Sequence, residues 1–347
     1  MNQIMWSPNS EQIQNSQMYS FMKFVNKKLN ISLNNYSDLY EWSITNGSDF
    51  WGYFWEYSKI IYHKPFINVV DNINKMPGAK WFEGATINFV ENLLQYRDEK
   101  VAVHFYGEDG NEKILTYKQL YNEVSKLANS FRGIGVKKND RIVGFMPNIP
   151  ETIIAMLATA SIGAIWSSCS PDFGIKGVLN RFSQIEPKVI ITASDYIYNG
   201  KTINCLSKIK DILSDLPSIE KTIIVPFKGS ANSIMINNSI AWDDFLAAEE
   251  SDIIFEYMPF DHPLYIMYSS GTTGLPKSIV HSSGGTLIQH LKELMLHTDL
   301  TREDKIFYFT TCGWMMWNWL VSSLAIGAKI ILYDGSPFYP NGTTLLE

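Results

Sequence analysis

From about residue 101 onward, short runs of β-branched and apolar residues alternate with segments that have helical spacing. Runs without a polar face are typical of parallel strands, which are buried on both sides of a sheet. Strands that alternate with helices indicate an α/β fold, with largely parallel sheets covered by helices. We expect strands at residues 101–106, 141–146, 164–167, 188–193, 221–226, 264–268, 305–311 and 328–334.

Capping residues mark where the intervening helices begin. Thr116 and Gln119 have the spacing of a capping box, in which a hydroxyl and an amide satisfy free N–H groups of the first turn. Pro150 suits the first position of an apolar helix that we expect to end at Ser161. Apolar residues at amphipathic spacing predict a further helix at residues 202–216.

The N-terminal part of the chain differs from the rest. Residues 1–95 are rich in aromatic side chains and asparagine, and we expect a mainly helical extension there, followed by the α/β unit at 96–347. Phe50, Phe54 and Tyr57 recur at i, i+4 and i+7, so one helix face is aromatic. We interpret this face as a packing surface rather than as a ligand site.

Charge and cysteine content exclude several classes of protein. The net charge of −6 argues against a nucleic-acid partner bound through a broad basic face, but it leaves a local anion site open. Three cysteines without a CxxC pair predict neither a disulfide framework nor a thiolate zinc site, and they favour a reducing, cytoplasmic location. Polar and glycine residues interrupt the apolar stretch at 314–333, so we expect a buried helix, a glycine stop and a strand rather than membrane insertion.

The strongest chemical signal is the segment at residues 268–277, with the sequence YSSGTTGLPK, which follows an apolar run. Glycine lets the backbone approach a ligand closely, and successive backbone N–H groups in such a turn bind anions. The hydroxyl groups add donors and the lysine adds a positive charge, so the segment suits the polyphosphate of a nucleotide. The predicted nucleotide-binding residues are Ser269, Ser270, Gly271, Thr272, Thr273, Gly274 and Lys277.

Two alternatives to this phosphate-loop interpretation remain open. The sequence GTTGLPKS at residues 271–278 has the length, lysine and serine of a Walker A loop. However, Pro276 stands where that motif has its second glycine, and the residues after Lys277 have strand character rather than helical character. The other alternative is a Ser/Gly-rich turn whose hydroxyl groups only cap local backbone.

The same segment resembles the signature of the adenylate-forming superfamily, which includes acyl-CoA synthetases, luciferases and nonribosomal adenylation domains. That signature has the form Y/T-S/T-S-G-S/T-T-G-x-P-K-G, and only Ser278 departs from it, in place of the last glycine. The resemblance covers essentially the whole chain, including WFEGATINFVENLL at 81–94 and MPNIPETIIAML at 146–157. The runs FTTCGWMMWNW at 309–319 and ILYDGSP at 331–337 are similar to the branch of acyl-CoA synthetases that activates acetoacetate.

This resemblance implies an acid–thiol ligase with acetoacetate, ATP and CoA as substrates. In such enzymes the carboxylate attacks the α-phosphate of ATP to give an acyl-adenylate and pyrophosphate, and the CoA thiol then displaces AMP. The loop that matches residues 269–277 holds the β- and γ-phosphates in that family, and preorganised donors stabilise the charge that develops on pyrophosphate. Mg²⁺ would share this neutralisation, although no metal ligand is assigned within the chain.

The resemblance also implies an acyl pocket. Trp314, Met315 and Met316 match positions that line this pocket in short-chain relatives, where bulky side chains admit only a small acid. Ordinary core packing is the alternative, because Met and Trp at helical spacing usually belong to a core.

Candidate CoA-binding residues follow from the same comparison. Arg181 and Lys201 fall near segments with which relatives contact the phosphates of CoA, and solvated surface charge is the alternative for each. His281 follows the loop closely, as a histidine does in relatives, and either contacts a ligand or has a structural role.

Several parts that the resemblance leads us to expect are missing from residues 1–347. They are a segment near adenine and magnesium, an aspartate for the ribose, a hinge, and a small domain whose adenylation lysine we expect beyond Glu347. We therefore expect a truncated AMP-binding domain with little or no activity alone, and no catalytic residue is assigned. The alternatives are a ligase for another short-chain acid, such as acetate or propionate, and a natural short form that binds nucleotide without catalysis.

Overall fold

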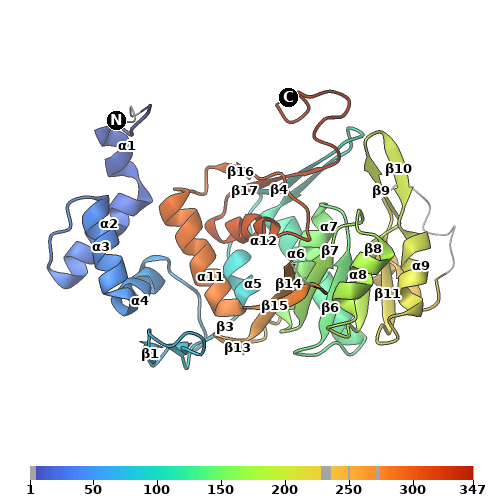
Figure 1. Ribbon diagram of the computed structural model, residues 1–347, viewed down its shortest axis with the longest axis horizontal. Coiled ribbons are helices and arrows are strands. Elements are labelled where there is room, and N and C mark those ends of the chain that lie inside the picture. Colours follow the sequence, from blue (N-terminus) through green and yellow to red (C-terminus); the bar gives the residue numbers. More distant parts are fainter. Residues whose placement is uncertain (1–4, 228–235, 249–250, 270–273, 347) are drawn as a thin grey trace.

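A computed structural model of the protein describes residues 5–227, 236–248, 251–269 and 274–346 (Figure 1). The predicted α/β class is confirmed. A seven-stranded sheet spans the centre and right of the view in Figure 1, and a group of N-terminal helices lies at the left. No helix in these described ranges has both the length and the apolar character that a membrane span requires.

The seven-stranded sheet is parallel except at one edge. Its order is β12-β11-β8-β6-β7-β14-β15, and only the β14–β15 pair is antiparallel. The predicted strands at these positions are therefore confirmed, with bounds shifted by a few residues. The bounds are β6 Arg141–Phe145, β7 Ile165–Cys169, β8 Val189–Ala193, β11 Lys221–Val225, β12 Ser239–Ala241, β14 Pro263–Ser269 and β15 Lys277–Ser282.

Helices cover both faces of this sheet. Successive side chains of a strand point to opposite faces. In β8, Val189 and Ile191 join the core cluster that contains α6 (Tyr117–Gly133) and α7 (Pro150–Ser161). Ile190, between them, joins the cluster that contains α8 (Ile175–Phe182) and α9 (Leu206–Ser214). The β-branched runs are thus buried on both sides, as the sequence predicts.

A second sheet has the order β16-β17-β4-β5. Between its first two strands the chain forms the predicted buried helix, and Gly327 at φ 84° ends the short 3₁₀ helix that follows. The predicted capping box of Thr116 and Gln119, at the start of α6, is also present. The bounds are β4 Val101–Gly107, β5 Glu112–Thr116, α10 Trp242–Phe245, α11 Ser283–Lys292, η1 Glu293–His297, β16 Lys305–Phe307, α12 Met315–Ser322, η2 Ser323–Ile326 and β17 Lys329–Asp334.

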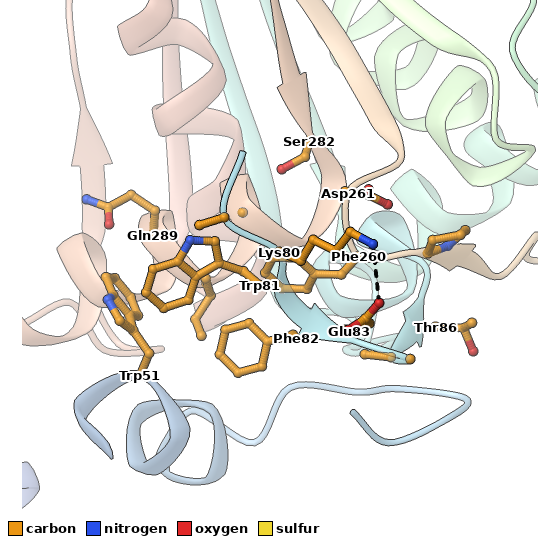
Figure 2. Close-up of a pocket in the computed structure, with 16 residues that line it drawn as sticks. Trp51, Lys80, Trp81, Phe82, Glu83, Thr86, Phe260, Asp261, Ser282 and Gln289 are labelled. Atoms are coloured by element: carbon orange, nitrogen blue, oxygen red, sulfur yellow. Dashed lines mark ion pairs between the residues drawn. The ribbon is translucent and has the colours of Figure 1, made fainter. Parts of the chain in front are cut away.

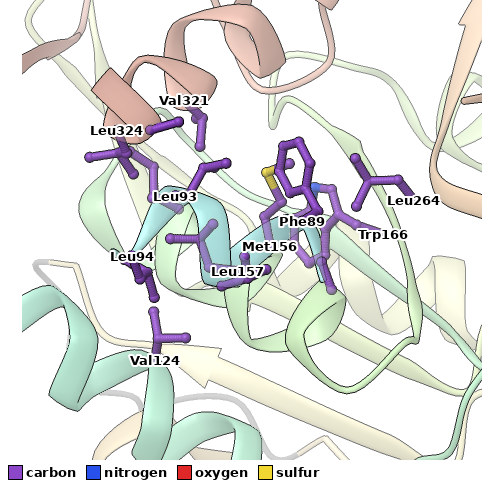
Figure 3. Close-up of a cluster of buried hydrophobic side chains, with 14 of the residues drawn as sticks. Phe89, Leu93, Leu94, Val124, Met156, Leu157, Trp166, Leu264, Val321 and Leu324 are labelled. Atoms are coloured by element: carbon purple, nitrogen blue, oxygen red, sulfur yellow. The ribbon is translucent and has the colours of Figure 1, made fainter. Parts of the chain in front are cut away.

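The short helix α5 (Phe89–Leu93) belongs to the main core, part of which is drawn in Figure 3. Its Leu93 lies among Leu157 of α7, Val321 of α12 and Leu324 of η2, all fully buried. Full burial of one such side chain contributes about 1.5–3 kcal/mol. This cluster therefore fixes α12 against the large sheet.

Aromatic packing builds the N-terminal region. The ring of Phe21 lies 5.7 Å from that of Phe50, 5.8 Å from Phe54 and 5.2 Å from Tyr57, so the predicted aromatic face packs one helix on another. Gln17 then fastens this group to the rest of the chain. Its backbone N–H donates to Asp299 Oδ1 (2.7 Å). The bounds are α1 Ser10–Asn15, α2 Gln17–Leu29, α3 Tyr36–Thr45, α4 Gly47–Tyr57, β1 Asn68–Val70, β2 Trp81–Glu83, β3 Thr86–Ile87 and β13 Met258–Pro259.

The helix predicted at residues 202–216 is wrong at its start. A hairpin of β9 (Asp195–Tyr198) and β10 (Lys201–Asn204) occupies this region first, and α9 begins only at Leu206. Asn199 and Gly200 form the turn with φ of 52° and 73°. An Asn-Gly pair with both φ values positive is the turn that best fits the twist of two antiparallel strands, and this local signal outweighs the helical periodicity.

Candidate nucleotide and acyl site

The β14–β15 hairpin carries the predicted phosphate loop. Ser269 pairs with Lys277 at the end of the hairpin. Lys277 therefore begins a strand, which contradicts the Walker A alternative because that loop leads into a helix. Gly274 is exposed. The other predicted nucleotide-binding residues, Ser270, Gly271, Thr272 and Thr273, lie outside the described residues.

The loop strand and the start of α12 lie at the same edge of the sheet. β14 runs parallel to β7, so Ser269 and Cys169 are at neighbouring carboxyl ends. Ser168 Oγ donates a hydrogen bond to the backbone oxygen of Cys312 (2.7 Å), two residues before Trp314. Open α/β sheets bind ligands in the crevice outside the carboxyl ends of their strands. The phosphate-loop strand and the predicted acyl residues are therefore both at an edge suited to a ligand.

Asn148 forms hydrogen bonds to several of the segments at this edge. It was not identified from the sequence. Its Nδ2 donates to the backbone oxygens of Thr310 (3.4 Å) and Tyr333 (3.2 Å). Its Oδ1 accepts from Trp317 Nε1 (2.9 Å), and its backbone N–H donates to Asp334 Oδ1 (2.8 Å). The signal was available as the Asn in MPNIP, three residues after a buried strand, but the partners lie more than 160 positions away.

The predicted acyl residues take different positions on α12. Trp314 is 65% exposed and Met315 is 38% exposed, so neither belongs to the core of the described part of the chain. Met316 is half-buried, and Trp317 is fully buried. The core-packing alternative therefore does not fit Trp314 or Met315, whereas the following tryptophan, Trp317, does belong to the core.

Arg181 is brought to the phosphate-loop strand. Its guanidinium lies 4.4 Å from the ring centroid of Phe173 and 5.7 Å from that of Tyr268, the residue before Ser269. It also donates to the backbone oxygen of Gly177 (2.8 Å). Lys201 is on a different element, the first residue of β10, and is exposed. The structure thus places the two candidate CoA residues in different surroundings.

Gln184, beyond the end of α8, joins the residues on either side of Lys277. Its Nε2 donates to the backbone oxygen of Pro276 (2.9 Å), and its Oε1 accepts from Ser278 Oγ (3.1 Å). Ser278 is the position at which the chain departs from the superfamily signature. The Ser278 hydroxyl, which a glycine would lack, forms a hydrogen bond that connects the end of the loop to Gln184 after α8.

If the segment binds nucleotide as predicted, we expect Ser278→Gly to weaken ATP binding roughly fivefold, because one exposed hydrogen bond contributes about 1 kcal/mol and glycine loosens the backbone beside Lys277. Calorimetric titration with ATP measures this change. In a Gln184→Leu background the serine has already lost its partner, so the part of the effect that comes from the hydrogen bond should disappear and only the part that comes from the glycine backbone should remain. An equal effect in both backgrounds would show that the hydrogen bond is not the cause.

His281 lies on β15, with its ring centroid 5.0 Å from that of Tyr265. Burial lowers the pKa of His281, so it is neutral near pH 7. His290 of α11 is more deeply buried. It shares a 2.7 Å hydrogen bond between its Nδ1 and Ser322 Oγ, and burial lowers its pKa to about 4.

A cavity of about 630 Å³ lies near the other end of the β14–β15 hairpin (Figure 2). It is lined by Ser282, which pairs with Pro263 at the opposite end from Ser269 and Lys277. Aromatic side chains form much of its wall, and Lys80 and Glu83 form an ion pair of 3.6 Å beside it. None of the described site residues named above lines this cavity, so we do not assign it to the nucleotide site.

Comparisons with known proteins agree with the resemblance seen in the sequence. Acetoacetyl-CoA synthetase from Gallus gallus is 47% identical over 356 residues, which cover 100% of this chain and 53% of the relative. Acetoacetyl-coenzyme A synthetase from Rhizobium meliloti (strain 1021) is 45% identical, covering 99% and 53%. The solved structure of acetoacetyl-CoA synthetase from Streptomyces lividans matches with a TM-score of 0.94 and 38% identity, covering 99% of this chain and 53% of that one.

The chain thus spans about half the length of the curated relatives it matches. The model of the acetyl-coenzyme A synthetase N-terminus matches residues 36–93. The model described as AMP-binding enzyme matches residues 89–347, most of the chain. The fold, the hairpin with its phosphate-loop sequence and these matches agree: the chain belongs to the AMP-binding enzyme family.

Proposed function

We propose that this chain carries the phosphate-binding part and one wall of the acyl pocket of an acetoacetate–CoA ligase. The observation that supports this most directly is the shared sheet edge, where β7 pairs with the strand that leads into the phosphate-loop sequence and bonds through Ser168 to Cys312, just before α12. Relatives that are 44–47% identical over nearly the whole chain are named acetoacetyl-CoA synthetase. AMP-binding enzymes join an acid to a carrier through an adenylate, which fits a site with both parts.

In this proposal each group of residues has a separate role. The segment 269–277, including Lys277, holds the β- and γ-phosphates and stabilises charge on the departing pyrophosphate. Trp314, Met315 and Met316 limit the size of the acid. Lys201 contacts the phosphates of CoA, with Arg181 as a weaker candidate because its guanidinium already lies against two rings.

Mg²⁺ is expected to accompany ATP in this reaction. Within the described residues, no three His, Cys, Asp or Glu side chains converge as a metal cage. Mg²⁺ commonly retains water and binds through substrate phosphates with one or two carboxylates. In this proposal the ion arrives with the triphosphate.

Replacement of Lys277 by alanine should raise the dissociation constant for ATP about ten- to a hundredfold, since hydrogen bonds to charged groups contribute about 1.5–3 kcal/mol. Calorimetric titration of the chain measures this directly. Lys176→Ala, an exposed lysine of α8, is the matched control and should change the constant less than twofold. Equal effects of the two substitutions would argue against a phosphate role for Lys277.

The reaction itself is tested by acid-dependent exchange of labelled pyrophosphate into ATP, with the protein in the form that its source cell produces. Acetoacetate should support exchange better than acetate, propionate or malonamate. The last acid belongs in the panel because malonamoyl-CoA synthetase vrtB from Penicillium aethiopicum is 41% identical to this chain. Faster exchange with another acid would move the assignment to that acid, and exchange with none would contradict ligase activity.

A further inference from the structure

Two segments that are far apart in the sequence converge on the carboxylate of Glu108, which follows β4. Glu108 Oε2 accepts from the backbone N–H of Asn199 (2.9 Å) and of Ser336 (2.6 Å). Glu108 Oε1 accepts from the backbone N–H of Gly200 (2.6 Å). Asn199 and Gly200 form the turn of the β9–β10 hairpin, and Ser336 lies just after β17.

These bonds are of a strong kind. An ionised carboxylate is an acceptor with two oxygens, and its hydrogen bonds to N–H groups are about twice as strong as those between neutral groups. Both residues of the hairpin turn have positive φ, 52° and 73°, and their successive N–H groups reach the same carboxylate. The conformation of the turn therefore directs both of its N–H groups to the carboxylate of Glu108.

A second contact fixes the same hairpin tip. A Cβ atom placed on Gly200 would lie 2.8 Å from the ring of Tyr339, so the backbone of the turn packs directly on the segment after β17. Glu108 also donates its own backbone N–H to the backbone oxygen of Asp334, at the end of β17 (3.0 Å). The hairpin is thus held to the end of the second sheet by side chain and backbone together.

Lys201 is the residue directly after this turn. Its backbone pairs with Tyr198 across the hairpin, and its side chain is exposed. With Gly200 held by Glu108, the direction in which Lys201 leaves the turn is set, while its ammonium group remains available to an anion. The carboxylate acts on the hairpin through backbone groups and leaves the lysine charge in place.

We propose that Glu108 is a positioning residue for CoA: it holds the β9–β10 turn so that Lys201 meets the phosphates of CoA. This rests on the ligase function proposed above and deepens it. It assigns Glu108 to the thioester-forming half-reaction and gives it no part in the adenylation half-reaction, which does not use CoA.

The test compares Glu108→Gln with Glu112→Gln in the protein as its source cell makes it. Glu112 lies on the same β4–β5 hairpin and pairs with His104 instead. Glu108→Gln should raise KM for CoA about tenfold and leave acid-dependent pyrophosphate exchange within twofold, while Glu112→Gln changes neither. Glu108→Asp, which keeps a carboxylate, should restore part of the loss, and urea unfolding of each variant checks that it is folded.

A double-mutant cycle with Lys201→Ala decides whether the two residues act together. The increase in KM for CoA in the double variant should be clearly smaller than the product of the increases in the two single variants, because Glu108 acts through the lysine. Multiplicative effects, or an equal loss of exchange and thioester formation in Glu108→Gln, would overturn the positioning role. Absence of exchange in the unsubstituted protein would instead reject the ligase function, so the two failures are distinguishable.

Discussion

Replacement of Trp317 by alanine is expected to lower the free energy of unfolding by about 3–5 kcal/mol, the usual loss for a buried aromatic side chain. Trp317 is fully buried among the core residues of α12 and donates its Nε1–H to Asn148 Oδ1 (2.9 Å). The substitution removes the ring and leaves the Asn148 oxygen without this donor. Urea unfolding followed by circular dichroism measures the change.

Trp314→Ala is the matched control, since the same residue type lies one helical turn earlier and is 65% exposed. Its effect on stability should stay within about 0.5 kcal/mol, as for most surface substitutions. Its effect should fall instead on KM for the acid. Similar losses of stability for the two tryptophans would contradict the distinction between core and pocket on α12.

Stability should also fall as the pH rises, because of Asp334. Burial raises the pKa of this carboxyl from 3.8 to about 7, with smaller contributions from the negative charges of Glu108 and Asp172. The folded chain therefore holds a proton that the unfolded chain has released, between about pH 4 and pH 7. The associated stability is fully present below pH 4 and is lost as the pH rises through 7. The difference between the two pKa values corresponds to roughly 4 kcal/mol in the free energy of unfolding.

Asp334→Asn isolates this effect, because the amide keeps an oxygen for the Asn148 N–H and does not ionise. The stability of the variant relative to the unsubstituted chain should rise by about 2–3 kcal/mol between pH 5 and pH 8. Asp211→Asn, at an exposed position of α9, is the matched substitution measured beside it. A pH-independent difference for Asp334→Asn would show that the carboxyl is ionised throughout.

The sheet and its helices were largely predictable from the sequence, for a physical reason. A parallel strand is buried on both faces, so a run such as 189–193 consists of β-branched and apolar residues without a polar face and stands out from its surroundings. Helix starts were visible where a cap is local, as at Thr116. The β9–β10 hairpin was missed because its amphipathic residues also fit a helical period, and the Asn-Gly turn signal was not weighed against it.

The site was predictable only in part. The phosphate-loop sequence is contiguous, so it can be recognised without a structure. The predicted similarity to acetoacetyl-CoA synthetases is confirmed by the relatives. Asn148 and Glu108 were not found, because each acts on backbone groups of distant segments and such bonds leave no periodic pattern. The acyl and CoA roles of Trp314, Met315, Met316, Arg181 and Lys201 stay predictions.

The attachment of the N-terminal helices has a consequence for how the chain is made. Gln17 donates its backbone N–H to Asp299 Oδ1 and its side-chain N–H to the backbone oxygen of Leu300, both at 2.7 Å. These partners leave the ribosome about 280 residues later, which takes roughly 15–60 s at the usual rates of synthesis. During that interval α2 lacks these two partners, and the aromatic contacts between Phe21 and α4 hold it to the other early helices. The N-terminal group is therefore expected to assemble early and dock late.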